Sequence, residues 1–257
     1  MRDSVKSILL WNLSSEFSVA VASALAASGY RLLLVGDNSE QLDEVDAALA
    51  QSELHRLRPQ AEARDLDAWV RSQAVGMDHA VLFPEPPSSP TTWPPAGTWN
   101  AQLDRCFVQP LEVIRTLRPL LNRGKKPKHL VIAFQWLELF TSSTAFDRTL
   151  RTTWAHAGRE LATELAPLET AVNLLWFGPL ATQETQTEMA RRAKLQDLPL
   201  DVYRRQLLSH LPLRSLPGPD EAAALLQRAL ETTSRCFTGN WVDLTGDGIA
   251  SPTSPEL

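Results

Sequence analysis

This chain of 257 residues contains only two cysteines and two tyrosines, and it has no excess of basic residues. Cys106 and Cys236 could form at most one bridge, so we expect reduced thiols rather than a disulfide framework. The formal net charge of −5 argues against a nucleic-acid-binding protein, because no basic stripe is present to neutralise phosphates. The five histidines show no metal-ligand spacing, so no metal site is expected.

Long hydrophobic runs are missing as well. The apolar part of residues 1–17 is too short for a signal peptide or a membrane span, so we expect a cytoplasmic protein and no membrane partner. A hydrophobic content of 44% and a charged content of 21% are ordinary for a globular protein. The length allows a full core, and α/β folds of this size are often one domain.

What the chain does contain is an alternation of buried-strand and helix patterns. This alternation predicts an α/β, Rossmann-like, doubly wound parallel sheet with helices on both faces, as a single domain over residues 1–257. A proline-rich loop at 84–97 is an insertion in that domain, and 183–215 is an irregular helical excursion. Strands are expected at 8–11, 31–35, 79–83, 129–133, 171–176 and 240–244, and helices at 19–27, 41–50, 69–74, 98–122, 144–166 and 221–231. Pro110 should kink or interrupt the helix at 98–122.

The first strand–turn–helix unit lacks glycine in its turn. Such a unit normally places a dinucleotide pyrophosphate on a helix N-terminus, and its glycines let the backbone approach the phosphates. Here the turn carries Asn12, Glu16 and Ser18. The strand–turn–helix unit is therefore present, but we expect that its turn no longer binds a pyrophosphate.

Six segments, in this order along the chain, together resemble the short-chain dehydrogenase/reductase family. The glycine-poor turn and its helix stand where the family has its glycine-rich motif, and MDHAVLFPE stands where it has a strand ending in Asn-Asn-Ala-Gly. The remaining four segments are CFVQPLEVIRTLRPLL, RTTWAHAGRELATELAP, VNLLWFGPLAT and CFTGNWVDLTGDG. The resemblance covers the full length and implies the family's fold. It also implies pairing through the two long helices, here 98–122 and 144–166.

The resemblance assigns the family's catalytic positions to residues that cannot do the usual chemistry. Neither Tyr30 nor Tyr203 lies where the family has its general acid. Asp147 takes that place, and a carboxyl group with a reference pKa near 3.9, against about 10 for tyrosine, would oppose a developing alkoxide. The positions of the family's Ser, Tyr, Lys and Asn are occupied by Phe134, Asp147, Arg151 and Cys106.

The cofactor positions that the resemblance implies are altered in the same way. At ~4 Å and an effective dielectric constant of ~20, the Glu16 carboxylate would repel a phosphate by on the order of 4 kcal/mol. Rings at Phe83, Phe134 and Phe177 are expected to fill the coenzyme's volume. We therefore expect no cofactor. The corresponding degenerate positions are Asn12, Glu16, Ser18, Gly36, Asp37, Phe83, Gly178 and Thr182.

The function expected from these positions is that of a catalytically inactive homologue. It would act as a structural or regulatory subunit, in a homo-oligomer or with an active relative. One alternative is a divergent NAD- or NADP-dependent oxidoreductase acting on a carbonyl or alcohol. Another is a cofactor-independent lyase or small-ligand binder that uses the former substrate cleft.

Overall fold

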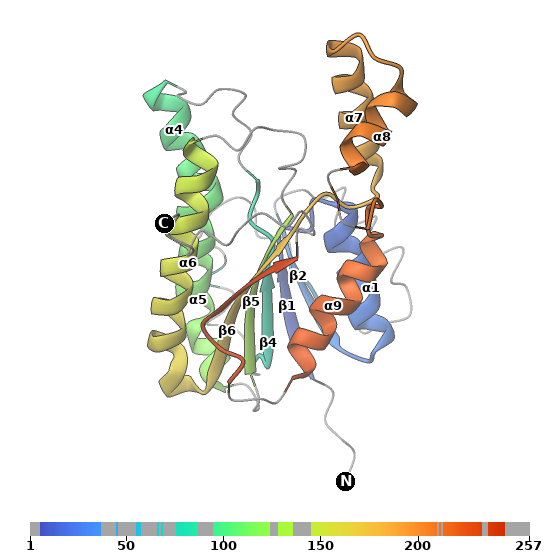
Figure 1. The fold of residues 1–257 in the computed structure, drawn as a ribbon. Coiled ribbons are helices and arrows are strands. Elements are labelled where there is room, and N and C mark those ends of the chain that lie inside the picture. Colours follow the sequence, from blue (N-terminus) through green and yellow to red (C-terminus); the bar gives the residue numbers. More distant parts are fainter. Residues whose placement is uncertain are drawn as a thin grey trace.

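All strands that the structure describes belong to one parallel sheet (Figure 1). The computed structural model describes residues 6–36, 45, 55–57, 66, 68, 76–86, 95–123, 128–135, 145–209, 211, 213–232 and 236–244. The strand order is β3-β2-β1-β4-β5-β6-β7, and each neighbouring pair is parallel. The strands are β1 (Ser7–Trp11), β2 (Arg31–Val35), β3 (His55–Leu57), β4 (His79–Leu82), β5 (Lys128–Gln135), β6 (Thr170–Phe177) and β7 (Asn240–Leu244).

The central strands are continuous apolar runs because helices cover both faces of the sheet. Successive side chains point to opposite faces, yet Leu9 and Leu10 of β1 are both fully buried. Leu10 packs in the core under α1 and α9, whereas Leu9 packs in the core under α5 and α6. Figure 1 shows these helix pairs on the two sides of the sheet. The helices are α1 (Glu16–Ala27), α4 (Ala96–Leu103), α5 (Gln109–Arg123), α6 (Ala145–Leu165), α7 (Gln183–Leu195), α8 (Leu200–Ser209) and α9 (Pro219–Glu231).

The expected fold class, an α/β doubly wound parallel sheet, is confirmed. The six expected strands are present, with ends shifted by a few residues at most. The short strand β3 was not expected, because His55–Leu57 lacks an apolar run. The helices expected at 41–50 and 69–74, and positions 87–94 of the proline-rich loop, lie outside the described residues apart from position 45.

The helix expected at 98–122 is divided into α4, a π-helical segment (Asp104–Val108) and α5. Pro110 is the reason, because it has no N–H to donate to the carbonyl of Cys106 four residues earlier. Trp154 of α6 supplies the missing donor, and its Nε1 lies 3.0 Å from that carbonyl oxygen. The predicted interruption is therefore confirmed, and the helix continues in a widened turn on the N-terminal side of the proline.

The excursion at 183–215 forms two helices, α7 and α8, beyond the carboxyl edge of the sheet (Figure 1). They carry a small core of their own, made of Met189, Ala193, Tyr203 and Leu207. Their base is closed by the amide of Ala181, which donates to the carbonyl of Pro217 at 2.9 Å.

The helices expected to meet a partner, α5 and α6, use their apolar faces within the chain. Their buried residues belong to the core against the sheet, and Arg118 of α5 forms a 2.8 Å ion pair with Glu164 of α6. Among the described residues of α5 and α6, no large apolar side chain is fully exposed. The exposed large apolar side chains of the expected helix 98–122 are Leu103 and Val108, which precede α5, so pairing through these helices stays a prediction. Among the described residues, no helix is both long and apolar enough to cross a membrane.

Candidate functional site

The strand order reverses between β1 and β4, and their carboxyl ends frame the candidate site. In open α/β sheets, ligands bind in the crevice at this switch point. Two loops meet here, the β1–α1 turn and the segment that follows β4. The amide of Phe83, just past β4, donates to the carbonyl of Trp11 at the end of β1 at 3.1 Å.

Asn12 keeps the backbone turn that a glycine would allow. Its φ is 64°, in the left-handed region that asparagine tolerates better than most residues. Its amide N–H donates to the carbonyl of Val35, and its side-chain Nδ2 donates to the carbonyl of Phe83, both at 2.8 Å. Asn12 thus joins the ends of β1, β2 and β4 through hydrogen bonds.

The start of α1 is capped by serines in place of the open glycine backbone. Ser15 is the N-cap, and its Oγ accepts from the amide of Ser18 at 3.2 Å. The amide of Ser15 donates to Ser18 Oγ at 3.1 Å, which completes a capping box. Ser18 is fully buried, so this position of the turn, where the resemblance implies a glycine, carries a packed and hydrogen-bonded side chain.

Glu16 joins this turn to the excursion. It is the first residue of α1, and its Oε1 accepts from the backbone N–H of Gln183, the first residue of α7, at 2.7 Å. The N-cap of α7 is Thr182, a buried residue whose Oγ1 accepts from the amide of Thr185 at 3.2 Å. The carboxylate therefore lies at the N-terminal ends of two helices, where the helix dipoles favour negative charge.

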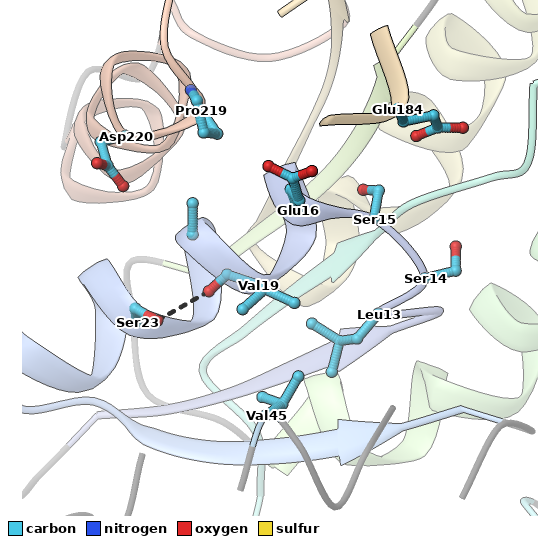
Figure 2. A pocket seen from close by; sticks show the side chains of 11 residues that line it. Leu13, Ser14, Ser15, Glu16, Val19, Ser23, Val45, Glu184, Pro219 and Asp220 are labelled. Atoms are coloured by element: carbon cyan, nitrogen blue, oxygen red, sulfur yellow. Dashed lines mark hydrogen bonds between the residues drawn. The ribbon is translucent and has the colours of Figure 1, made fainter. Parts of the chain in front are cut away.

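Two cavities adjoin this turn. The larger, of about 710 Å³, has an apolar wall formed by Leu13, Val19 and Val45 (Figure 2). Its polar lining consists of Ser14, Ser15, Glu16, Ser23, Glu184 and Asp220. Figure 2 shows the Glu16 side chain between the starts of α7 and α9, marked by Glu184 and Pro219.

The smaller cavity, of about 70 Å³, lies at the switch point between the ends of β1, β4 and β5. It is lined by Phe17, Phe83, Pro84 and Gln135 among others, and it shares Ser14, Ser15 and Glu184 with the larger cavity. The two cavities thus meet at the β1–α1 turn and follow the carboxyl edge of the sheet.

Aromatic rings narrow the switch point. Phe17 of α1 meets Phe83 edge-on at 5.7 Å between ring centroids and Phe177 of β6 at 4.7 Å. Phe83 and Phe177 lie in the core on the α1 side of the sheet. Phe134 lies in the other core, beneath α6, and is stacked on Trp176 at 4.0 Å. Gly178 is buried directly after β6, Gly36 follows β2, and Asp37 lies outside the described residues.

The residues that the resemblance assigns to the family's catalytic positions are engaged in packing and ion pairing. Arg151 forms an ion pair with Asp243 of β7 at 3.2 Å, and its guanidinium lies over the rings of Trp176 and Trp241 at 5.0 and 5.6 Å. Asp147, one turn earlier on α6, is also buried. Asp243 is missed by sequence reasoning, because nothing in the pattern of β7 shows which helix residue it faces.

Cys106 has no nucleophilic character near neutral pH. Burial, aided by the neighbouring Glu85 carboxylate, raises the pKa of its thiol to about 12. Both cysteines are free, as expected. Tyr30 lies before β2, at the opposite edge of the sheet, and Tyr203 belongs to the small core of α7 and α8. Among the described residues, no cluster of three or more His, Cys, Asp or Glu could hold a metal ion.

Comparison with known proteins gives a structural likeness only. No protein-family model matches the sequence, and no curated protein matches it. The solved structure of YwfH, an NADPH-dependent reductase involved in bacilysin biosynthesis, has a TM-score of 0.80 at 18% identity and covers 96% of this chain and 100% of its own. A short-chain oxidoreductase from Pseudomonas aeruginosa PAO1 containing an atypical catalytic center has a TM-score of 0.80 at 19% identity, with 97% and 98% covered.

A third similar structure is L-sorbose reductase from Gluconobacter frateurii complexed with NADPH and L-sorbose, with a TM-score of 0.77 at 18% identity and 96% and 98% covered. These likenesses confirm the fold that the ordered segments predicted. They contradict the expectation of no cofactor, because YwfH is described as NADPH-dependent and the sorbose reductase contains NADPH. Sequence reasoning took the altered turn as evidence against binding, but it could not detect the cavity beside that turn.

Proposed function

We propose that this chain, which has the fold of short-chain dehydrogenases and reductases, is a divergent oxidoreductase that binds a nicotinamide dinucleotide and acts on a carbonyl or alcohol substrate. The observation that carries the proposal is the cavity of about 710 Å³ at the β1–α1 turn, beside the switch point of the sheet. The oxidoreductase class is supported by the fold likeness. It includes a protein named as an oxidoreductase although its catalytic center is atypical.

The larger cavity fits the adenosine half of the coenzyme. Its volume is within the range of about 300–1,000 Å³ that is typical of ligand pockets. Leu13, Val19 and Val45 form an apolar wall for a purine, and the hydroxyl groups of Ser14 and Ser15 can bond to ribose.

The charge of this lining favours NADH over NADPH. Three carboxylates line the cavity, those of Glu16, Glu184 and Asp220, and no Lys or Arg is among its described lining residues. Ribose hydroxyl groups can donate to carboxylates, whereas a 2′-phosphate would be repelled by them. We therefore expect a coenzyme preference that differs from that of the NADPH-dependent YwfH and of the sorbose reductase that contains NADPH.

The nicotinamide half does not fit the switch point as the structure shows it. A bound coenzyme would supply hydride at this edge of the sheet, but a cavity of about 70 Å³ is too small for a nicotinamide and its ribose. Phe17 and Phe83 would need to move apart before a nicotinamide could enter. Asp147 and Arg151 are the polar side chains that the chain offers at the family's catalytic positions.

A second candidate function is that of a dinucleotide-binding subunit that catalyses no reaction. The ion pair of Arg151 with Asp243 and the buried Phe134 favour it, because neither residue can hold a substrate oxygen in that arrangement. Turnover of a broad carbonyl and alcohol panel with NADH and NAD⁺ separates the two. Turnover by the natural chain that is lost in Arg151→Met supports the oxidoreductase function. Binding of the coenzyme without any turnover supports the function as a non-catalytic subunit.

Calorimetric titration with NADH, NADPH and adenosine tests the binding proposal. We expect one site for NADH, with NADPH about tenfold weaker or more because of the carboxylates. Val19→Trp should fill the cavity and abolish binding, whereas Ala27→Trp, at the exposed end of the same helix, should leave it unchanged. No heat from NADH or adenosine at millimolar concentration, or equal binding by both variants, would refute the proposal.

A further inference from the structure

The hydrogen bond between Glu16 and Gln183 places an internal anion where the two cavities meet. Glu16 lines the larger cavity, and its neighbours Ser14 and Ser15 line both. A ligand that extends from the larger cavity to the switch point must therefore pass the Glu16 carboxylate. The middle part of a dinucleotide is its pyrophosphate, which carries the same sign of charge as the carboxylate.

The carboxylate and a pyrophosphate would compete for the same donor. Backbone N–H groups at helix N-termini bind phosphates because they are unpaired and lie at the positive end of the dipole. In this chain the first N–H of α7 already donates to Glu16 Oε1 at 2.7 Å. The carboxylate is also the first side chain of α1, so it neutralises the positive ends of both helices.

We propose that Glu16 is a built-in competitor of the dinucleotide, which binds fully only by displacing the carboxylate from the amide of Gln183. This inference rests on the proposed dinucleotide binding and names the residue that controls it. Displacement also removes the hydrogen bond that joins the start of α7 to the start of α1. The excursion of α7 and α8 has its own small core, and its base is closed by the hydrogen bond between Ala181 and Pro217, so its internal packing does not depend on the bond to Glu16.

The first test needs no ligand. Hydrogen exchange measured by NMR reports the Gln183 amide directly. In Glu16→Ala this amide should exchange about tenfold faster or more, because its acceptor is gone. Glu184→Ala is the matched control, since it removes a carboxylate from the same cavities without removing that acceptor. Unchanged protection of Gln183 in Glu16→Ala would overturn the inference.

The second test compares affinities for NADH and for adenosine, which has no phosphate. Glu16→Ala should bind NADH about tenfold more tightly, because an exposed charge is screened but still repels a pyrophosphate at close range. Adenosine should bind the variant and the natural chain equally. Glu16→Gln keeps an acceptor for the amide of Gln183 but removes the charge, so its gain in NADH affinity should be smaller than that of Glu16→Ala. This second variant also allows the test to be made if Glu16→Ala does not fold.

The outcomes separate this inference from the function on which it rests. NADH binding that is equal in all variants, or raised as much by Glu184→Ala, would overturn the role of Glu16 and leave the proposed function standing. Absence of NADH and adenosine binding in the natural chain and in every variant would overturn both.

Discussion

At the scale of single residues, the altered positions of the site are engaged in new bonds. Asn12 takes the left-handed turn and joins two further strand ends, and Ser18 completes a capping box. Arg151 is paired with Asp243, and its guanidinium lies over the rings of two tryptophans. The sequence shows which residue types occupy these positions. It cannot show their partners, because Asp243 and Gln183 are distant in sequence and meet only in the folded chain.

A pair of buried histidines gives the chain a pH-sensitive stability. His79 and His129 face each other on β4 and β5 with ring centroids 5.4 Å apart, and Tyr30 lies against His79. Burial, with further contributions from His129 and Lys6 that outweigh that of Asp78, lowers the pKa of His79 to about 3. Burial also lowers the pKa of His129.

As the pH falls, the histidines of the unfolded chain, with ordinary pKa values near 6.5, are protonated before those of the folded chain. The contribution of the neutral His79 to the free energy of unfolding is therefore fully present above about pH 6.5 and is lost as the pH falls toward 3. His79 should cost about 2 kcal/mol between pH 7 and pH 5, and His129 adds a loss in the same direction.

Urea unfolding at both pH values measures this loss. His79→Met, which keeps an apolar group of similar size in the core, should reduce the loss by about 2 kcal/mol. A free energy of unfolding that is the same at pH 7 and pH 5, or an equal loss in His79→Met, would contradict the prediction.

At the scale of elements, the sequence predicts strands and long helices well, because apolar runs and 3.6-residue periods are local signals. The ends of α6 and β7 are predicted to within one residue. The π-helical segment before Pro110 depends on Trp154, which lies 48 positions away from the carbonyl that it bonds. β3 has three residues and no apolar run, so it owes its strand conformation to pairing with β2.

The packing of α6 on β6 depends on one glycine. A Cβ added to Gly158 would overlap Cδ1 of Leu174, which is buried in the core. Gly158→Ala should therefore lower the free energy of unfolding by about 1–3 kcal/mol, as overpacking does.

Gly97 in α4 is the matched control, because a Cβ there meets no atom within 4 Å among the described residues. Gly97→Ala should be neutral or stabilising by about 0.5 kcal/mol, since alanine favours the helix. Denaturant unfolding of the two variants measures their free energies of unfolding. An equal effect of both substitutions would show that a Cβ at position 158 does not disturb the packing of α6 on β6.

At the scale of the whole molecule, the sheet has a separate core on each face, and the cavities open at its carboxyl edge near the switch point. The sequence predicts this architecture. It leads to the wrong conclusion about the cofactor because residue types alone do not reveal space. Val45, Asp220 and the start of α7 create the larger cavity only when three distant segments come together.

The most direct test of this account is a crystal structure of the protein with NADH. We predict that the adenosine lies in the cavity between Leu13, Val19 and Val45, that the pyrophosphate lies at the start of α1, and that Glu16 no longer accepts from the amide of Gln183. NADH located elsewhere, or a vacant cavity with the Glu16–Gln183 bond intact at a saturating concentration of NADH, would contradict the account.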